Sequence, residues 1–354
     1  MNAAIKEAGA GSAASCRKVQ VRINVARFWP GAAEELIEAL LPDLQPYYDF
    51  TISDSPQVVL YGPYPGELPS GQYVKVFIGC ENVRPLMSEC DWAFGVEHED
   101  GVGDPRYMRI ARWGDDAHFV QRSRDWREVL PGKTRFCAFI YRQEVHFRET
   151  FFRALSGYKQ VDAPGQSMNN MPSIDPLPGK VDWDAKVAFL RNYKFVIAFE
   201  NSSWPGYNTE KLTHAIEADC VPIYWGDPEI GRSFNAARFI KAHDYLPRQR
   251  RLLPRLPYRP HSLKSAGNPG LLGRVARRAN RMISDTEQRF WAWRGFDRLV
   301  ERIIEIDRDD DLYLRHLREP FLLGNRPPDR TAWIDRWRQI FDQSLGYPAE
   351  SRSR

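Results

Sequence analysis

One stretch, residues 193–227, constrains the fold of this chain more than any other part of its sequence. Residues 194–200 alternate apolar and aromatic side chains without a breaker, as in a buried strand. The polar run 201–208 (NSSWPGYN) ends that strand, apolar residues at helical spacing follow Thr209, and 221–225 is a second short apolar run. The pattern predicts a β-turn-α-β unit, which places ligands at the carboxyl ends of its strands, beside the first N–H groups of the helix. We therefore expect this stretch to hold an anion.

The residue order within this stretch is specific as well as periodic. It reads FENSxxxxYxTEK, followed by a helix and then VPIYWG. This order resembles the donor-binding signature of the α-1,3/4-fucosyltransferase family, and the resemblance extends more weakly over residues 19–320, interrupted by one large insert. Members of that family, here of the bacterial type, are inverting glycosyltransferases that use GDP-fucose. The resemblance implies an α/β fold of the GT-B class, with two Rossmann-like domains facing across a cleft.

The length of 354 residues suits two domains. We expect a flexible leader at 1–18, an N-terminal acceptor-binding domain at 19–130 and a C-terminal GDP-fucose-binding domain at 131–330. The apolar face of helix 331–345 is expected to pack back on the first domain. Further elements follow from the periodicity. Strands are expected at 19–25, 57–61, 73–79, 92–96, 135–141 and 237–244, and helices at 32–41, 115–130 and 145–156.

Candidate donor-binding residues come from the motif and from one distant arginine. Arg148 stands near the start of helix 145–156, where a guanidinium can clamp a diphosphate. Arg142 is the alternative clamp, because Tyr141-Arg142 replaces the Ser-Asn that relatives usually carry. The resemblance also implies donor contacts from the loop GQSMNN, which ends at Asn170. Within the motif it assigns phosphate, sugar or ribose contacts to Asn201, Tyr207, Glu210 and Lys211.

A candidate general base follows another strand. Glu81 comes directly after residues 73–79, at the carboxyl end where the cleft should open, and the resemblance assigns the base to the same position. Trp29 lies between the first expected strand (19–25) and the helix 32–41, at the strand end, where its ring either receives a sugar or caps the sheet core. Glu97 belongs to the cluster VEHEDG, which has the composition of a solvated turn and is a second candidate for lining the acceptor cleft.

The chemistry that these residues suit is a direct displacement. No His, Cys or Ser stands at the spacing of a metal site or of a covalent catalytic centre. Asp182-Trp183-Asp184 formally matches a metal motif, but it opens a helix and is interpreted as a cap. Fixed cations would stabilise the leaving diphosphate, so no cofactor is required and a divalent metal would at most be stimulatory.

Charge and cysteine content bear on partners and compartment. The positive charge is concentrated in one segment, since residues 246–284 carry nine Arg and one Lys and no acidic residue. The chain has a net charge of +4, so the rest of it sums to −6. This insert predicts either a solvated loop or contact with an anionic membrane near a lipid-linked acceptor. Nucleic-acid binding is not expected, because the insert has few aromatic residues and lacks the aromatic interleaving that base stacking requires. Five cysteines without a pairing framework, and no apolar signal segment, favour the cytoplasm or the inner face of the plasma membrane.

The sequence therefore predicts transfer of L-fucose from GDP-fucose to a hydroxyl of an N-acetylglucosamine- or glucose-containing glycan, with inversion. Two alternatives stay open at this stage. One is a transferase that uses another nucleotide sugar, and the other is a catalytically silent carbohydrate-binding protein.

Overall fold

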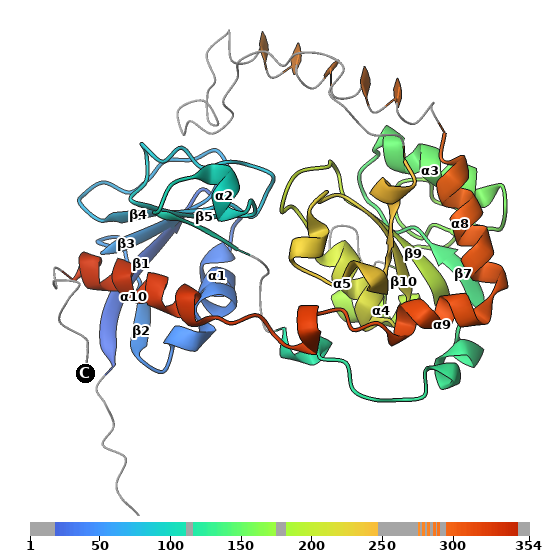
Figure 1. Cartoon of the computed structure of the whole chain (residues 1–354). Coiled ribbons are helices and arrows are strands. Elements are labelled where there is room, and N and C mark those ends of the chain that lie inside the picture. Colours follow the sequence, from blue (N-terminus) through green and yellow to red (C-terminus); the bar gives the residue numbers. More distant parts are fainter. Residues whose placement is uncertain are drawn as a thin grey trace, which may run out of the picture.

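The computed structural model describes residues 18–110, 116–174, 182–246 and 295–345, together with short pairs of residues between 275 and 290. The expected leader, apart from its last residue, and most of the expected insert 246–284 lie outside this described part. Two parallel sheets form separate units that lie side by side (Figure 1). The expected α/β fold with two Rossmann-like units is thus confirmed.

The first sheet has the order β2-β1-β3-β4-β5-β6, and all its strand pairs are parallel. Its strands are β1 (Val19–Ala26), β2 (Tyr48–Ile52), β3 (Val58–Tyr61), β4 (Val74–Ile78), β5 (Trp92–Gly95) and β6 (Tyr107–Arg109). The helices of this unit are α1 (Ala32–Leu40), the short α2 (Glu99–Val102) and the distant α10 (Thr331–Ser344). Alternate residues of β3 point to opposite faces, so Val58 and Leu60 join the core under α1 and α10 while Val59 and Tyr61 join a smaller cluster.

Helix α10 returns from the end of the chain to this first sheet (Figure 1). Its buried face, Trp337, Ile340 and Phe341, belongs to the same core cluster as α1. The Trp337 ring stacks on Phe94 of β5 with centroids 4.6 Å apart, and Trp92 donates its indole N–H to Gln343 at 2.7 Å. Apolar spacing at every third or fourth residue is what gives α10 this buried stripe.

The second sheet has the order β11-β10-β9-β7-β8, again all parallel. Its strands are β7 (Arg135–Ala138), β8 (Val161–Asp162), β9 (Tyr193–Phe199), β10 (Val221–Trp225) and β11 (Ile240–Lys241). Helices α3 (His146–Ser156), α8 (Asp297–Arg308) and α9 (Asp310–Arg318) share a core with one face of this sheet. Helices α4 (Trp183–Leu190) and α5 (Glu210–Glu217) pack with residues of the other face, such as Val196.

Residues 115–130 do not form the single helix that periodicity predicts. Two 3-10 turns, η2 (Ala117–Phe119) and η3 (Trp126–Gly132), flank an extended segment in which Gln121 exchanges hydrogen bonds with Asn325. Phe119 and Trp126 are buried in cores of the second unit. These two residues lie before the expected division at residue 130, yet both pack with the second unit.

Both sheets carry the same topological switch. In each, the first strand in chain order lies between the second and the third, so the loops after β1 and β3, and those after β7 and β9, diverge at the carboxyl edge. Open parallel sheets bind ligands at such edges. No helix among the described residues is both long and apolar enough to span a membrane.

Candidate functional site

The switch point between β7 and β9 opens into a pocket, which we call the β7/β9 pocket. Its volume is about 260 Å³. It is lined by Ile140, Tyr141, Arg142, Gln143, Arg148, Gly165, Gln166, Ile174, Trp183, Lys186, Asn201, Glu210 and Lys211. Four of the residues that the sequence assigned to donor binding therefore meet here, on the loop after β9, the first turn of α5 and helix α3.

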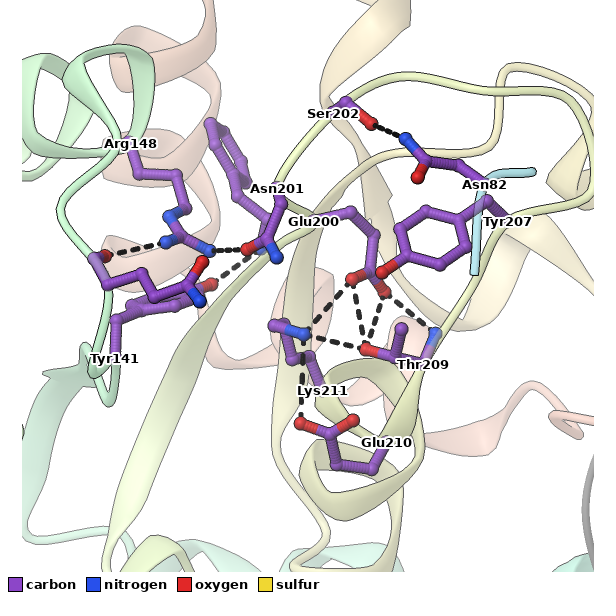
Figure 2. A network of polar contacts seen from close by, with 12 residues as sticks. Asn82, Tyr141, Arg148, Glu200, Asn201, Ser202, Tyr207, Thr209, Glu210 and Lys211 are labelled. Carbon is purple, nitrogen blue, oxygen red and sulfur yellow. Dashed lines mark hydrogen bonds and ion pairs between the residues drawn. The ribbon is translucent and has the colours of Figure 1, made fainter. Parts of the chain in front are cut away.

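The Arg148 side chain, on α3, reaches the loop after β9 at the switch point. Its side chain is only 1% exposed, and its guanidinium donates to the Asn201 amide oxygen and to the Gln143 carbonyl, each at 2.7 Å (Figure 2). It also lies 4.0 Å above the ring of Tyr141. Burial lowers the pKa of this guanidinium from its usual value, opposed by Tyr141 and Glu200. A buried, oriented guanidinium is the geometry that diphosphate recognition requires.

Tyr141 explains how Arg148 is oriented. The Tyr141 hydroxyl donates to the Ile197 carbonyl at 2.7 Å and accepts from the Phe199 N–H at 2.7 Å, which ties the end of β7 to β9. Its ring then forms a platform under the guanidinium. Arg142, the alternative clamp, also lines the pocket, but its side chain is exposed.

A buried carboxylate organises the helix start beside the pocket. Glu200 is 0% exposed and accepts from the Thr209 N–H at 2.8 Å and from the Thr209 hydroxyl at 3.0 and 2.9 Å. Lys211 approaches Glu200 at 3.1 Å, Glu210 at 3.6 Å and the Thr209 hydroxyl at 2.8 Å (Figure 2). Thr209 occupies the expected N-cap position, but its side chain serves Glu200 and makes no capping bond to α5. The network fixes the Lys211 ammonium at the pocket wall.

The pKa values of the two carboxyl groups in this network are shifted in opposite directions. Burial raises the pKa of the Glu200 carboxyl, with Lys211 opposing the shift. For Glu210, burial alone would raise the pKa, but Lys211 and Lys186 together hold it below its usual value. Glu210 is therefore an ionised acceptor that can take hydrogen bonds from hydroxyl groups of a ligand.

Glu81 belongs to the first unit and follows β4. Tyr64 donates to one of its carboxylate oxygens at 3.3 Å, and Tyr207 of the second unit donates to the other at 3.3 Å. Burial raises the pKa of the Tyr207 hydroxyl, and the neighbouring Glu81 adds to the shift. Tyr207 does not line the β7/β9 pocket; its hydroxyl joins the motif loop to Glu81.

Three other residues that the sequence assigned to the site do not line the β7/β9 pocket. Asn170 lies outside the pocket lining, because its amide accepts from the Ala163 N–H at 2.7 Å and donates to the Val161 carbonyl at 2.9 Å. Glu97 is not part of a solvated turn, since it is buried and its carboxylate pairs with Arg84. Trp29 is 40% exposed and packs edge-on against Phe28 and near Tyr64. It therefore belongs to an aromatic group beside Glu81.

The DWD sequence is a helix cap. Asp182 accepts from the Ala185 N–H at 2.9 Å at the start of α4. Within the described ranges, no three His, Cys, Asp or Glu side chains are grouped as ligands of a metal ion.

The two units meet through the motif loop 201–208. Asn82 donates to the Ser202 hydroxyl at 2.7 Å (Figure 2). Its neighbour Glu81 makes the contact with Tyr207. Sequence reasoning predicted Glu81 and Tyr207 but missed Tyr64, Glu200 and the pair of Asn82 and Ser202. Glu200 carried a signal, because it lies within the motif, whereas nothing in the sequence around Tyr64 indicates its partner.

Comparison with known proteins agrees with this geometry. The model of the glycosyltransferase family 10 (fucosyltransferase) C-terminal region matches residues 106–256, and the model of the α-(1,3)-fucosyltransferase FucT N-terminal domain matches residues 23–114. The two matches overlap at residues 106–114 and together cover residues 23–256, which include all the strands except the first half of β1.

Individual relatives match more partially. The Helicobacter pylori α-(1,3)-fucosyltransferase FucT is 24% identical over 291 residues, 69% of this chain and 58% of that protein. A putative fucosyltransferase of Acanthamoeba polyphaga mimivirus is 36% identical over 129 residues, 35% of this chain and 22% of that protein. The Bos taurus GDP-fucose protein O-fucosyltransferase 3 is 38% identical over 85 residues, 23% and 18% of the two chains. The chain thus spans less than two thirds of the length of each of these relatives.

Solved structures extend the likeness to the whole fold. A crystal structure of an α1,3-fucosyltransferase with GDP superimposes with a TM-score of 0.64 at 20% identity, covering 96% of this chain and 94% of that one. A second, with GDP-fucose, gives 0.62 at 19% identity, covering 99% and 95%. The fold is accordingly GT-B. With the two overlapping family models, the motif and the switch-point pocket in agreement, this chain belongs to the fucosyltransferases of glycosyltransferase family 10.

Proposed function

We propose that the protein transfers L-fucose from GDP-fucose to a hydroxyl of a glycan that contains N-acetylglucosamine or glucose, with inversion at the anomeric carbon. The observation that carries the proposal is the meeting of Arg148, Asn201, Glu210 and Lys211 in one pocket, with Glu81 held opposite by Tyr207. The names of the similar structures, which include GDP and GDP-fucose complexes, support the choice of donor.

The proposed donor site uses two cations and one carboxylate. Arg148 and Lys211 hold the diphosphate, whose negative charge grows as the glycosidic bond breaks, so that they stabilise the transition state more than the ground state. Asn201 contacts the phosphate or the sugar, and Glu210 accepts hydrogen bonds from the ribose. Because these side chains supply the positive charge themselves, we propose that no cofactor is required and that a divalent metal is at most stimulatory.

The proposed acceptor site is centred on Glu81. As the acceptor oxygen attacks the anomeric carbon from the face opposite the diphosphate, its proton passes to the Glu81 carboxylate and GDP departs with the electron pair of the broken bond. This single displacement accounts for inversion. The exposed ring of Trp29, next to Tyr64, offers a surface for the apolar face of an acceptor sugar. A role for Glu97 in acceptor binding is not retained, because Arg84 occupies its carboxylate.

Contact with an anionic membrane, and with a lipid-linked acceptor on its inner face, remains part of this proposal. It rests on the charge of residues 246–284 alone. Sedimentation with vesicles that contain phosphatidylserine, compared with neutral vesicles, tests it directly.

The central test is a mass-spectrometric transfer assay with GDP-fucose and N-acetyllactosamine-type acceptors, run with and without EDTA. Glu81→Gln and Lys211→Ala should each lower turnover by at least about 10²-fold, as expected on removing a general base or a charge stabiliser. Glu34→Gln and Lys75→Ala, on exposed positions of α1 and β4, serve as matched controls and should keep normal turnover.

The alternatives give different results in the same assay. A transferase for another nucleotide sugar would be active only with a second donor in a panel of GDP- and UDP-sugars. A silent carbohydrate-binding protein would bind acceptor without releasing GDP from any of them. Near-normal turnover in Glu81→Gln or Lys211→Ala would refute the role given to that residue.

A further inference from the structure

Arg109, at the end of β6, lies between the two units and is not part of the donor pocket. Its guanidinium donates to the Val96 carbonyl at 2.8 Å within its own unit. It also donates to the Ser233 hydroxyl at 2.8 Å and to the Gly206 carbonyl at 3.3 Å, both in the second unit. Burial lowers the pKa of this guanidinium from its usual value, with the Asp227 and Glu99 carboxylates opposing. One side chain of the first unit is therefore bonded to the motif loop of the second.

Gly206 is the point at which that loop touches the first unit. Its φ of +79° lies in the left-handed region, and a Cβ atom there would stand 2.0 Å from the Val96 carbonyl oxygen. The same carbonyl accepts the Arg109 bond, so Arg109 and Gly206 converge on one backbone oxygen. The conformation of the turn is thus fixed by the other unit as well as by its own sequence.

The residue after this turn is Tyr207, whose hydroxyl contacts Glu81 at 3.3 Å. Its carbonyl accepts from the buried Tyr224 hydroxyl at 3.3 Å and its N–H donates to the Trp204 carbonyl at 3.1 Å. The Gly206 carbonyl that Arg109 bonds belongs to the peptide that links Gly206 to Tyr207, so this bond acts directly on the backbone that carries the Tyr207 ring. A displacement of Gly206 would therefore change the contact with Glu81.

We propose that Arg109 is a positioning residue for fucosyl transfer. By bonding Gly206 to the first unit, it places Tyr207 against Glu81 and so aligns the base of one domain with the donor loop of the other. The inference rests on the proposed function, because Glu81 and Tyr207 matter for turnover only if they serve the transfer. Arg109 itself touches none of the groups that we assign to either substrate.

The test compares Arg109→Met and Arg109→Lys with the matched controls Arg106→Met and Arg106→Lys, three positions earlier in the chain, where the arginine pairs with the Asp104 carboxylate. Each variant is made in the wild-type and the Tyr207→Phe backgrounds. Because residues in contact are coupled, Arg109→Met should lower kcat by about tenfold in the wild type and by less than about twofold once the Tyr207 hydroxyl is gone. Calorimetry with GDP separates binding from turnover, and thermal unfolding identifies variants that do not fold. If Arg109→Met does not fold, Arg109→Lys carries the test, since it keeps the charge but not the three-way geometry.

Hydrogen–deuterium exchange supplies a readout that needs no activity. Peptides covering residues 201–208 should exchange faster than in the wild type in both Arg109 variants. In both Arg106 controls they should exchange at the wild-type rate. Equal losses of kcat in the two Tyr207 backgrounds, or unaltered exchange of 201–208, would overturn the inference while leaving the transferase proposal standing. If the wild type transfers nothing from GDP-fucose, the proposed function fails, and with it the positioning role of Arg109.

Discussion

At the scale of single residues, the least expected feature is the fully buried Glu200 carboxylate beside the pocket. It pairs with Lys211 at 3.1 Å in a position that has no exposed surface of its own. Breaking one side of such a pair usually destabilises a protein strongly, because the other charge is left without its partner. Glu200 is thus better understood as the group that keeps Lys211 in place than as a group that meets the substrate.

We expect Glu200→Gln to lower the free energy of unfolding by about 3 kcal/mol. GDP should then raise the thermal midpoint of this variant more than that of the wild type, because the diphosphate replaces the missing carboxylate as the partner of Lys211. Differential scanning calorimetry with and without GDP measures both effects. The double variant Glu200→Gln, Lys211→Met is the control and should recover stability. A Glu200→Gln protein as stable as the wild type would contradict this account.

His243 gives a second prediction, concerning pH. The His243 imidazole and the Ser203 hydroxyl share a hydrogen bond of 3.3 Å. The imidazole also stacks on the Trp225 ring, with the ring centroids 6.0 Å apart. Burial lowers its pKa to about 4, and Lys241 adds to the shift. The folded state therefore binds fewer protons than the unfolded state between about pH 6.5 and about pH 4, so stability is present above this window and is lost as pH falls through it.

Replacing His243 by Gln should remove that loss, which amounts to about 3 kcal/mol when the ordinary histidine pKa is the reference. Urea titrations at a series of pH values, wild type beside His243→Gln, measure the difference in slope. Ser203→Ala serves as a control that leaves the imidazole in place. Parallel stability curves for the wild type and His243→Gln would show that His243 does not carry the acid sensitivity.

At the scale of elements, the sequence predicts best where one periodicity persists and is bounded by clear breakers. The strand at 221–225 was expected and found with the same bounds, since all five of its side chains are buried. Strands β6 and β8 contain three and two residues, too few for a period to be recognised. The helix expected at 115–130 failed for another reason: Phe119 and Trp126 anchor separate cores, and an extended backbone reaches both.

Helix α10 is the element with the largest consequence for stability, because it closes the core of a unit that begins about 300 residues earlier in the chain. Trp337 is 0% exposed and stacks on Phe94. We expect Trp337→Ala to destabilise the protein by about 3–5 kcal/mol, as large cavities in cores do. Gln339→Ala, on the exposed side of the same helix, should change stability by less than about 0.5 kcal/mol. Guanidinium denaturation measures the free energy of unfolding of both variants. Equal effects of the two substitutions would mean that α10 is not part of the core.

At the scale of the whole molecule, the contents of the pocket were predictable but the contacts between the units were not. Arg148, Asn201, Glu210 and Lys211 lie close in sequence to strand ends that the topology brings to one edge. The pairs that join the units, such as Asn82 with Ser202, connect residues 120 positions apart with no pattern to relate them. Asn170 shows the converse case, since a polar residue in the expected loop is used by the backbone of its own turn.

Among the described residues, each buried apolar cluster lies within one unit, and the side-chain hydrogen bonds named above between the units are polar. Interfaces of that kind allow domains to move unless a few contacts hold them. The exposed pair of Arg232 and Asp100, at 3.2 Å, is the kind that contributes little. Gly206 is different, because its contact with Val96 is between two backbones and neither can withdraw without moving its strand or loop. This contact therefore limits how closely the two units can approach at the motif loop.

Gly206→Ala should accordingly separate the units without unfolding either. The added methyl group would stand 2.0 Å from the Val96 carbonyl oxygen, and the φ of +79° disfavours any side chain. We expect transfer to fall by at least about tenfold, since reacting groups on the two units lose their alignment, and small-angle X-ray scattering to give a larger radius of gyration. Gly231→Ala is the matched control, because a Cβ there meets nothing within 4 Å. Wild-type scattering and turnover in Gly206→Ala would show that the units are held together elsewhere, whereas loss of turnover without a change in scattering would confine the effect of Gly206 to the loop itself.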